Sequence, residues 1–442
     1  MYLQTDDQTI DDLRIFGKRD SSGVCDLYNR VHTRGGEALL KELFRAPLSD
    51  MEKINTRSGI LQHFAANRIP FPFSASMFDM AEKYMLSVEE VNRQGNNKSL
   101  LSEKEIANGV AALIELMQVT RSFIDSSSVT GLAAYSAERE SIAAILNDAA
   151  FEPVLRESGK SRLAYAAVAA YDVLFRNREH AKVNRLLQHI YYLDVLLSVA
   201  AVAVERGFVF PKAHAAKRVE LLLEGVYHPE LRSAVANDVH MQESQNLIFL
   251  TGANMAGKST FLRSVSVAMY VAHMGFPVAA KRMEFSVMDG IYTTINLPDN
   301  LGIGASHFYA EVLRVKQVAA ELSKGRSIFV VFDELFRGTN VKDAHEASVA
   351  VALAYAKKRN SMFIISSHII EAGDQLKQLN NIGFLYLPTR MNGNIPEYTY
   401  RLEKGITDDR HGMIIIRNEG ILEILEKGKK HLLGEHSLAS GE

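Results

Sequence analysis

Residues 247–261 read LIFLTGANMAGKSTF, and this stretch decides the fold of the second half of the chain. Its apolar start predicts a buried strand, the motif G-x-x-x-x-G-K-S follows directly, and the pattern from Phe261 onward predicts a helix. In such a turn, two glycines let successive backbone N–H groups point to one place, and the positive end of the helix is directed there too. The stretch therefore predicts a site for the phosphates of a nucleotide.

The side chains of this loop have separate expected roles. Lys258 can reach the β- and γ-phosphates of a nucleoside triphosphate, and the hydroxyl group of Ser259 can ligate Mg²⁺. We expect the loop as a whole to bind the nucleotide, through Gly252, Ala253, Asn254, Met255, Ala256, Gly257, Lys258, Ser259 and Thr260.

Two further strand patterns end in polar residues. The run 328–332 ends in Asp333 and Glu334, where we expect Asp333 to hold Mg²⁺ and Glu334, across the pleat, to polarise the attacking water. The run 362–366 is followed by His368. Because the carboxyl ends of parallel strands meet at one edge of a sheet, His368 is expected to sense the γ-phosphate or to orient water. These residues indicate hydrolysis.

Ser306 precedes an apolar pattern that predicts a helix, and two interpretations of it stay open. It is the N-cap of that helix, worth about 1 kcal/mol, or part of an anion site at the helix terminus. In the second case the site is available to a nucleotide held by another subunit.

The hydrophobic pattern divides the chain near residues 210–225. Before that point it is helical, and residues 161–206 contain neither Gly nor Pro, so a continuous helix there would be roughly 65–70 Å long. After Val219, short apolar runs alternate with helical patterns, which favours a mainly parallel α/β sheet. The strands are expected at 247–251, 327–332, 362–366, 383–387 and 398–402.

Composition bounds the function and the compartment. The length of 442 residues predicts about three domains, and a hydrophobic content of 47% is enough for their cores. Because 50 Lys and Arg balance 52 Asp and Glu, a nucleic acid would bind only through local basic patches. The single cysteine, Cys25, excludes a disulfide within the chain and fits a reducing compartment. With no secretory signal and no apolar run of about 20 residues, we expect a cytoplasmic protein with no membrane segment.

Several motifs carry a family likeness. TGANMAGKSTFLR, DNLGIGASHF, DELFRGTN and SSH make the carboxy-terminal half resemble the ATPase domain of the MutS family of DNA mismatch-repair proteins, a branch of the ABC-type ATPases, and they occupy residues 251–263, 299–308, 333–340 and 366–368. Residues 35–54 and 192–211 are similar to the two ends of that family's helical core and lever domain.

The resemblance implies a helical core and lever domain over 1–215 and an ATPase domain with a parallel sheet over 216–442, ending in a helical dimerisation segment. ATP and Mg²⁺ are the implied cofactors. The roles carried over are phosphate and Mg²⁺ binding by Lys258 and Ser259, metal binding by Asp333, catalysis by Glu334, γ-phosphate contact by His368, nucleotide sensing by Asn254, and action in trans by Ser306.

This chain departs from the family pattern at several points. By this resemblance the chain is expected to start at the lever, without the mismatch-reading and connector domains, and the clamp between the lever helices is expected to be absent or reduced. Ala234 and Val235 stand where an aromatic residue would stack on adenine, and His307 replaces a Thr beside Ser306. The resemblance thus implies a dimeric Mg-ATP switch, related to mismatch repair or recombination, that acts on DNA with repair proteins, and we expect mismatch reading by this chain alone to be absent or weak. The alternative is an ATP-gated scaffold for protein partners.

Overall fold

The structure is a computed structural model. It describes residues 1–19, 21–94, 101–158, 163–215, 219–295, 307–368, 370–392, 395–407, 420–421 and 424–425. The predicted dimerisation segment lies largely outside these residues.

The chain divides into two compact units. Unit 1 comprises residues 1–3, 14–213 and 270–279, and unit 2 comprises residues 4–13, 214–269 and 280–442. The sequence predicted a helical first part and a mixed second part, but it did not predict that residues 4–13 belong to unit 2.

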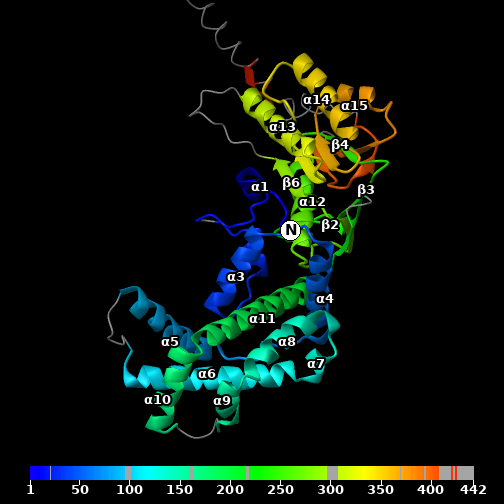
Figure 1. The fold of residues 1–442 in the computed structure, drawn as a ribbon. Helices are drawn as coiled ribbons and strands as arrows, with labels where there is room; N and C mark the ends of the chain where they lie inside the picture. The colour runs from blue at the N-terminus through cyan, green and yellow to red at the C-terminus, as the bar shows by residue number, and fades with distance from the viewer. Residues whose placement is uncertain are drawn as a thin grey trace, which may run out of the picture. The chain divides into compact units, whose positions relative to one another are not determined.

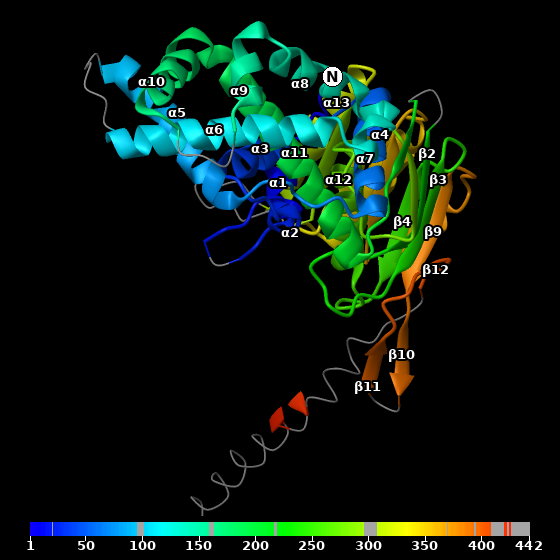
Figure 2. The same ribbon diagram turned by 90° about the horizontal axis from the view of Figure 1, so that it is seen from below.

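Unit 1 is built from helices, shown from two sides in Figures 1 and 2. Its longest helix, α11, packs against α3, α4 and α8, while α5 packs against α6. The helices are α2 (Val24–Tyr28), α3 (Arg34–Arg45), α4 (Met51–Asn67), α5 (Ala75–Gln94), α6 (Glu103–Ile124), α7 (Ser127–Thr130), α8 (Ser136–Leu146), α9 (Glu152–Arg156), α10 (Tyr165–Val173) and α11 (His180–Arg206). Short 3₁₀ turns cover Ala133–Tyr135 and Ala149–Phe151.

The long helix expected over residues 161–206 is not continuous. After α10 the chain makes a π-turn, Leu174–Arg178, and Glu179 leaves the helical region at φ −119° and ψ 20° before α11 begins. The π-turn places Phe175 in the core, and Arg176 binds Asp172 at 2.7 Å. Side-chain packing therefore sets the break without a Gly or Pro, and α11 alone is about 40 Å long.

One helix in the described part of the chain, α11, is long and apolar enough to cross a membrane. However, 72% of its most apolar window is buried inside the structure, as in the central helix of a bundle.

Unit 2 contains a six-stranded sheet in the order β12-β9-β4-β8-β7-β6, in which all neighbours are parallel except β12 and β9. The predicted strands at 247–251, 327–332, 362–366 and 383–387 are confirmed. The sheet consists of β4 (Leu247–Gly252), β6 (Gly290–Thr294), β7 (Ile328–Phe332), β8 (Met362–Ser366), β9 (Ile382–Leu387) and β12 (Glu403–Lys404).

The prediction of a strand at residues 398–402 is wrong. β11 (Ile395–Tyr398) pairs with β10 (Thr389–Asn392) in a separate hairpin, which Figure 2 shows projecting from the sheet. Tyr400 has φ +54°, outside the extended region, so the chain turns there and cannot continue the strand.

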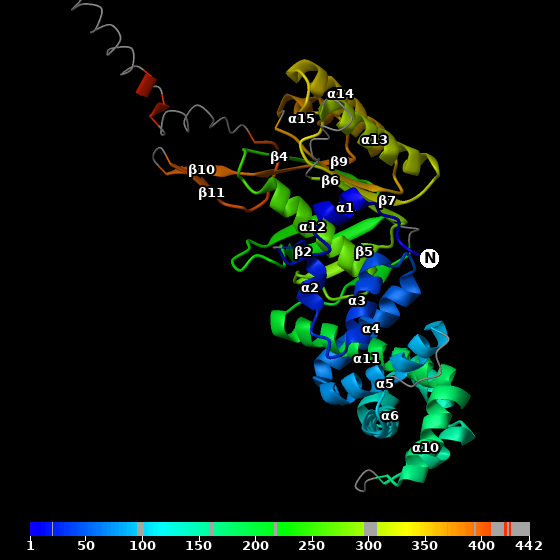
Figure 3. The ribbon, with the colours of Figure 1, turned by 90° about the vertical axis from the view of Figure 1, so that its left-hand side faces the viewer.

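Helices cover both faces of the six-stranded sheet. Figure 3 shows α12 (Lys258–His273) on one side of β4, and α13 (His307–Ser323) and α14 (Val341–Ala356) on the other, where α15 (Ile370–Leu376) packs against α14. Alternate residues of the strands, such as Phe249 and Phe363, are buried with Tyr355 of α14 in one apolar cluster. Both faces of the central strands are buried, which explains their continuous apolar runs.

Elsewhere in unit 2, β2 (Glu220–Val226) pairs antiparallel with β3 (Asn237–Gln242) and with β5 (Arg282–Ser286), and the sequence pattern did not predict these strands. β1 (Lys212–His214) spans the point where the chain passes from unit 1 to unit 2. The short helix α1 (Asp7–Asp12) lies at the open edge of β6.

Candidate functional site

The glycine-rich loop joins the end of β4 at Gly252 to the start of α12 at Lys258. Three of its residues have positive φ: Gly252 at +152°, Met255 at +69° and Gly257 at +98°. A Cβ atom at Gly257 would lie only 2.9 Å from Cδ1 of Tyr400, so glycine is required there by both backbone and space. The loop therefore has the turn that its sequence predicts.

Lys258 reaches back over the loop. Its Nζ atom donates to the carbonyl oxygen of Gly252 at 2.8 Å and to that of Ala253 at 3.2 Å, and it lies 3.8 Å from Oε1 of Glu334. Burial lowers the pKa of this ammonium group, although Glu334 and Asp333 act in the opposite direction. A polyanionic ligand would add to their effect and stabilise the charged form.

The carboxylate of Asp333 is held by two serine hydroxyl groups. Ser259, at the start of α12, donates to one carboxylate oxygen and Ser366, at the end of β8, donates to the other. Burial raises the pKa of Asp333, and the two hydrogen bonds oppose that rise. The structure thus brings together the two residues predicted to bind metal, Ser259 and Asp333.

Glu334 lies in a turn after β7, and not on the opposite face of the strand as predicted. Its φ is +53°, and its backbone N–H donates to Oγ of Ser366 at 3.1 Å. Its carboxylate lies between Lys258 and Arg337, whose NH1 atom is 3.2 Å from Oε2. A non-glycine residue in the left-handed region stores strain of about 1–3 kcal/mol, and such residues cluster at functional sites.

Other predicted residues are not brought into this cluster. His368 is exposed beyond the end of β8, and no hydrogen bond or ion pair joins it to Lys258 or Glu334 in the described part of the chain. Asn254 is exposed on the loop, and Thr260 is exposed in the first turn of α12. Ser306 lies outside the described residues, one position before α13 begins.

The sequence pattern did not identify two residues that lie at the site, Ser366 and Tyr400. Ser366 was quoted only within a motif, yet its hydroxyl group contacts both Asp333 and the backbone of Glu334. Tyr400 is 45% exposed beside Gly257, and its carbonyl oxygen accepts from Nδ2 of Asn237 at 2.9 Å. No local signal could reveal Tyr400, because it is more than 140 positions from the loop in the sequence.

The donor atoms fit Mg²⁺. Mg²⁺ prefers oxygen ligands and is usually held by one or two protein groups together with water and substrate phosphates. The hydroxyl group of Ser259 and the carboxylate of Asp333 are hydrogen-bonded to each other, so one ion could take both as ligands after the hydroxyl proton turns away.

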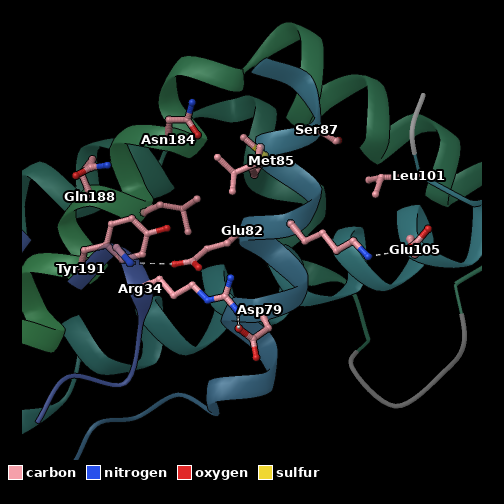
Figure 4. A pocket seen from close by; sticks show the side chains of 14 residues that line it. Arg34, Asp79, Glu82, Met85, Ser87, Leu101, Glu105, Asn184, Gln188 and Tyr191 are labelled. Atoms are coloured by element: carbon pink, nitrogen blue, oxygen red, sulfur yellow. Dashed lines mark hydrogen bonds and ion pairs between the residues drawn. The ribbon is translucent and has the colours of Figure 1, made fainter. Parts of the chain in front are cut away.

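A separate cavity of about 850 Å³ lies within unit 1 and contains none of the predicted site residues (Figure 4). Its two lining cations are already paired, Lys83 with Glu105 at 2.7 Å and Arg34 with Asp79 at 4.0 Å. The cavity therefore offers no unbalanced positive charge for phosphate.

The comparisons with known proteins cover the part of the chain that carries this site. The family model described as MutS domain V matches residues 248–433. A DNA mismatch repair protein MutS from Persephonella marina is 28% identical over 272 residues, which are 60% of this chain and 31% of that protein. The protein of the same name from Leuconostoc citreum is 30% identical over 286 residues, 62% of this chain and 32% of that protein.

A parallel sheet with a glycine-rich loop before α12 and a half-buried Asp after β7 is an arrangement typical of α/β proteins that bind nucleotides. Over residues 248–433 the chain is similar to domain V of the MutS family, and curated proteins named DNA mismatch repair protein MutS match 56–60% of its length. The matched part spans about a third of the length of the curated relatives.

Replacing Ser366 with Ala is expected to destabilise unit 2 by about 1–2 kcal/mol, because the half-buried Asp333 carboxylate and the N–H of Glu334 lose their shared partner. Thermal unfolding measures the loss. The matched control is Ser266→Ala, since Ser266 is equally buried but donates only to a carbonyl of its own helix. A loss no larger than in the control would contradict the role of Ser366.

Proposed function

We propose that this protein is a Mg²⁺-dependent ATP hydrolase and a dimeric nucleotide switch that acts on DNA. The observation that carries the proposal is the convergence of Lys258, Ser259, Asp333 and Glu334 at one end of the parallel sheet, beside the glycine-rich loop. We assign ATP binding and hydrolysis to residues 216–442.

Each side chain has a defined task in this proposal. Lys258 exchanges its bonds to the loop carbonyls for bonds to phosphate oxygens, and Ser259 and Asp333 hold Mg²⁺, which neutralises phosphate charge when bound. Glu334 accepts the proton of the attacking water, and the turn at φ +53° keeps its carboxylate close to Lys258. His368 contacts the γ-phosphate from the neighbouring strand end.

Tyr400 is the proposed stacking surface for the base. Its exposed ring lies beside Gly257, and Asn237 fixes its backbone through the Tyr400 carbonyl at 2.9 Å and the Leu402 N–H at 2.7 Å. Asn237 follows Val235 by two residues, so Tyr400 lies near the segment where an aromatic residue was expected. An aromatic ring from the end of the sheet then replaces the missing one.

The proposed dimer and the proposed DNA target are inferred from the relatives. The matched proteins are named DNA mismatch repair proteins, which suggests DNA as the cargo and repair proteins as partners. Ser306 precedes α13, so we propose that it approaches a nucleotide held by a second copy and completes that site. In this proposal ATP binding closes the dimer. The protein acts in the cytoplasm.

A second candidate function is an ATP-gated scaffold for protein partners. The balance of 50 basic and 52 acidic residues favours it, because a DNA-binding surface needs clustered cations.

The Glu334→Gln variant is expected to bind Mg-ATP within about twofold of the wild type while turnover falls at least about a hundredfold, because the amide keeps the shape but cannot accept a proton. Steady-state phosphate release and nucleotide titration measure the two quantities. Lys258→Ala serves as the contrasting variant, because it removes the charge at the phosphates and weakens binding itself. Unchanged turnover in Glu334→Gln would exclude hydrolysis by this residue.

Mixing Ser306→Ala with Lys258→Ala subunits tests action in trans. In the heterodimer both lesions fall on one composite site and the other site is whole, so part of the lost turnover should return. Each variant alone at the same total concentration is the control. No recovery, with heterodimers confirmed by tagged pull-down, would show that Ser306 does not serve the partner's nucleotide.

A titration with duplex and branched DNA at several salt concentrations separates DNA from protein cargo. For a DNA-acting switch we expect stimulated turnover and an affinity that falls steeply with salt, because bound phosphates release counterions. Absence of both effects would favour the scaffold. The Lys258→Ala variant reports DNA binding that is independent of nucleotide.

A further inference from the structure

The amino-terminal segment Gln4–Leu13 covers the open edge of the six-stranded sheet. Gln4 forms a parallel bridge to Gly290 of β6, and its N–H donates to the carbonyl of Asp289 at 2.8 Å. Alternate backbone N–H groups along that edge are each accepted by this segment: Ile291 by Gln4 O at 3.0 Å, Thr293 by Thr9 Oγ1 at 3.0 Å, and Ile295 by Asp12 Oδ2 at 2.8 Å. These contacts are enough to protect the edge strand.

The same segment makes one contact that edge protection does not require. Asp6, the N-cap of α1, accepts from two guanidinium nitrogens of Arg314 on α13, NH1 and NH2, the latter at 3.2 Å. The Arg314 side chain is only 6% exposed. Burying an ion pair costs desolvation energy, and an apolar pair of similar size would often serve stability equally well.

Arg314 links this ion pair to the candidate metal site. Its Nε donates to Oγ1 of Thr294 at 3.1 Å, and NH2 donates to the carbonyl of Thr293 at 2.8 Å. The carbonyl of Thr294 in turn accepts the backbone N–H of Asp333 at 2.8 Å. The end of β6 thus lies between the guanidinium group and the backbone of Asp333.

We propose that Asp6 and Arg314 are positioning residues for the Mg²⁺ site, which act through Thr294 on Asp333. This inference rests on the proposed function, because it concerns the same site. The guanidinium group of Arg314 binds the carboxyl end of β6 at two points, Thr294 Oγ1 and the Thr293 carbonyl, and β6 in turn binds the backbone that carries the Asp333 carboxylate. A lysine could not make these bonds together, since it has one nitrogen.

The test uses the full chain with Asp6→Asn, Arg314→Lys and Asp6→Glu. Asp374→Asn is the matched control, because Asp374 pairs with Lys377 on an exposed face of α15 in the same unit. The measurements are turnover, thermal stability, and the affinity for ATP with and without Mg²⁺. The ratio of the two affinities reports on the metal site even where hydrolysis is slow.

For Asp6→Asn and Arg314→Lys we expect turnover to fall on the order of tenfold and the Mg²⁺ enhancement of ATP affinity to fall about fivefold. A small displacement of the metal-binding carboxylate of Asp333 is enough to weaken metal binding and slow the reaction. Affinity without Mg²⁺ stays within about twofold, and Asp6→Glu restores at least half of the loss. Asp374→Asn leaves all these quantities unchanged.

The inference is overturned if turnover and the Mg²⁺ enhancement both stay within about twofold of the wild type, whatever the thermal stability does, because the pair would then only stabilise the fold. Failure of the proposed function is a different result: wild-type turnover that survives Glu334→Gln. The Mg²⁺ enhancement of affinity still decides the role of Asp6 and Arg314 in that case.

Discussion

The half-buried carboxylate of Asp333 is the constraint on which the site depends. A carboxylate withdrawn from water needs hydrogen-bond partners, and Asp333 takes them from two serines that lie far apart in the sequence, Ser259 and Ser366. The three residues can meet only if β7, β8 and the start of α12 are in register at one end of the sheet. The parallel pairing of β8 with both β4 and β7 supplies that register.

The strained backbone conformations at the site also depend on contacts made across the fold. Met255, Glu334 and Phe336 all have positive φ without being glycine, and they lie in the two turns that follow β4 and β7. The buried contacts around them, including the bond from the Glu334 N–H to Ser366, offset the cost of these conformations. A turn held in this way places the Glu334 carboxylate beside Lys258 before any ligand arrives, which reduces the ordering that binding must later impose.

The edges of the sheets in unit 2 are contacted by segments that lie far away in the sequence. Residues 4–13 take the open edge of β6, and residues 399–402 turn away from the sheet and return to Asn237 of β3. One segment places Asp6 against Arg314 at the end of the edge strand β6, and the other places Tyr400 beside Gly257 of the glycine-rich loop. Segments outside the sequence motifs therefore contribute to the surroundings of the candidate site.

The sequence alone determined the central strands and the loop. Continuous apolar runs predict buried parallel strands, and Gly252 and Gly257 stand where positive φ is required, because both signals are local. Tertiary structure alone decided the break at Leu174–Arg178, the edge cover by residues 4–13, and the positions of Ser366 and Tyr400. These features depend on contacts between side chains that are far apart in the sequence. Neither hydrophobic periodicity nor turn composition encodes such tertiary contacts.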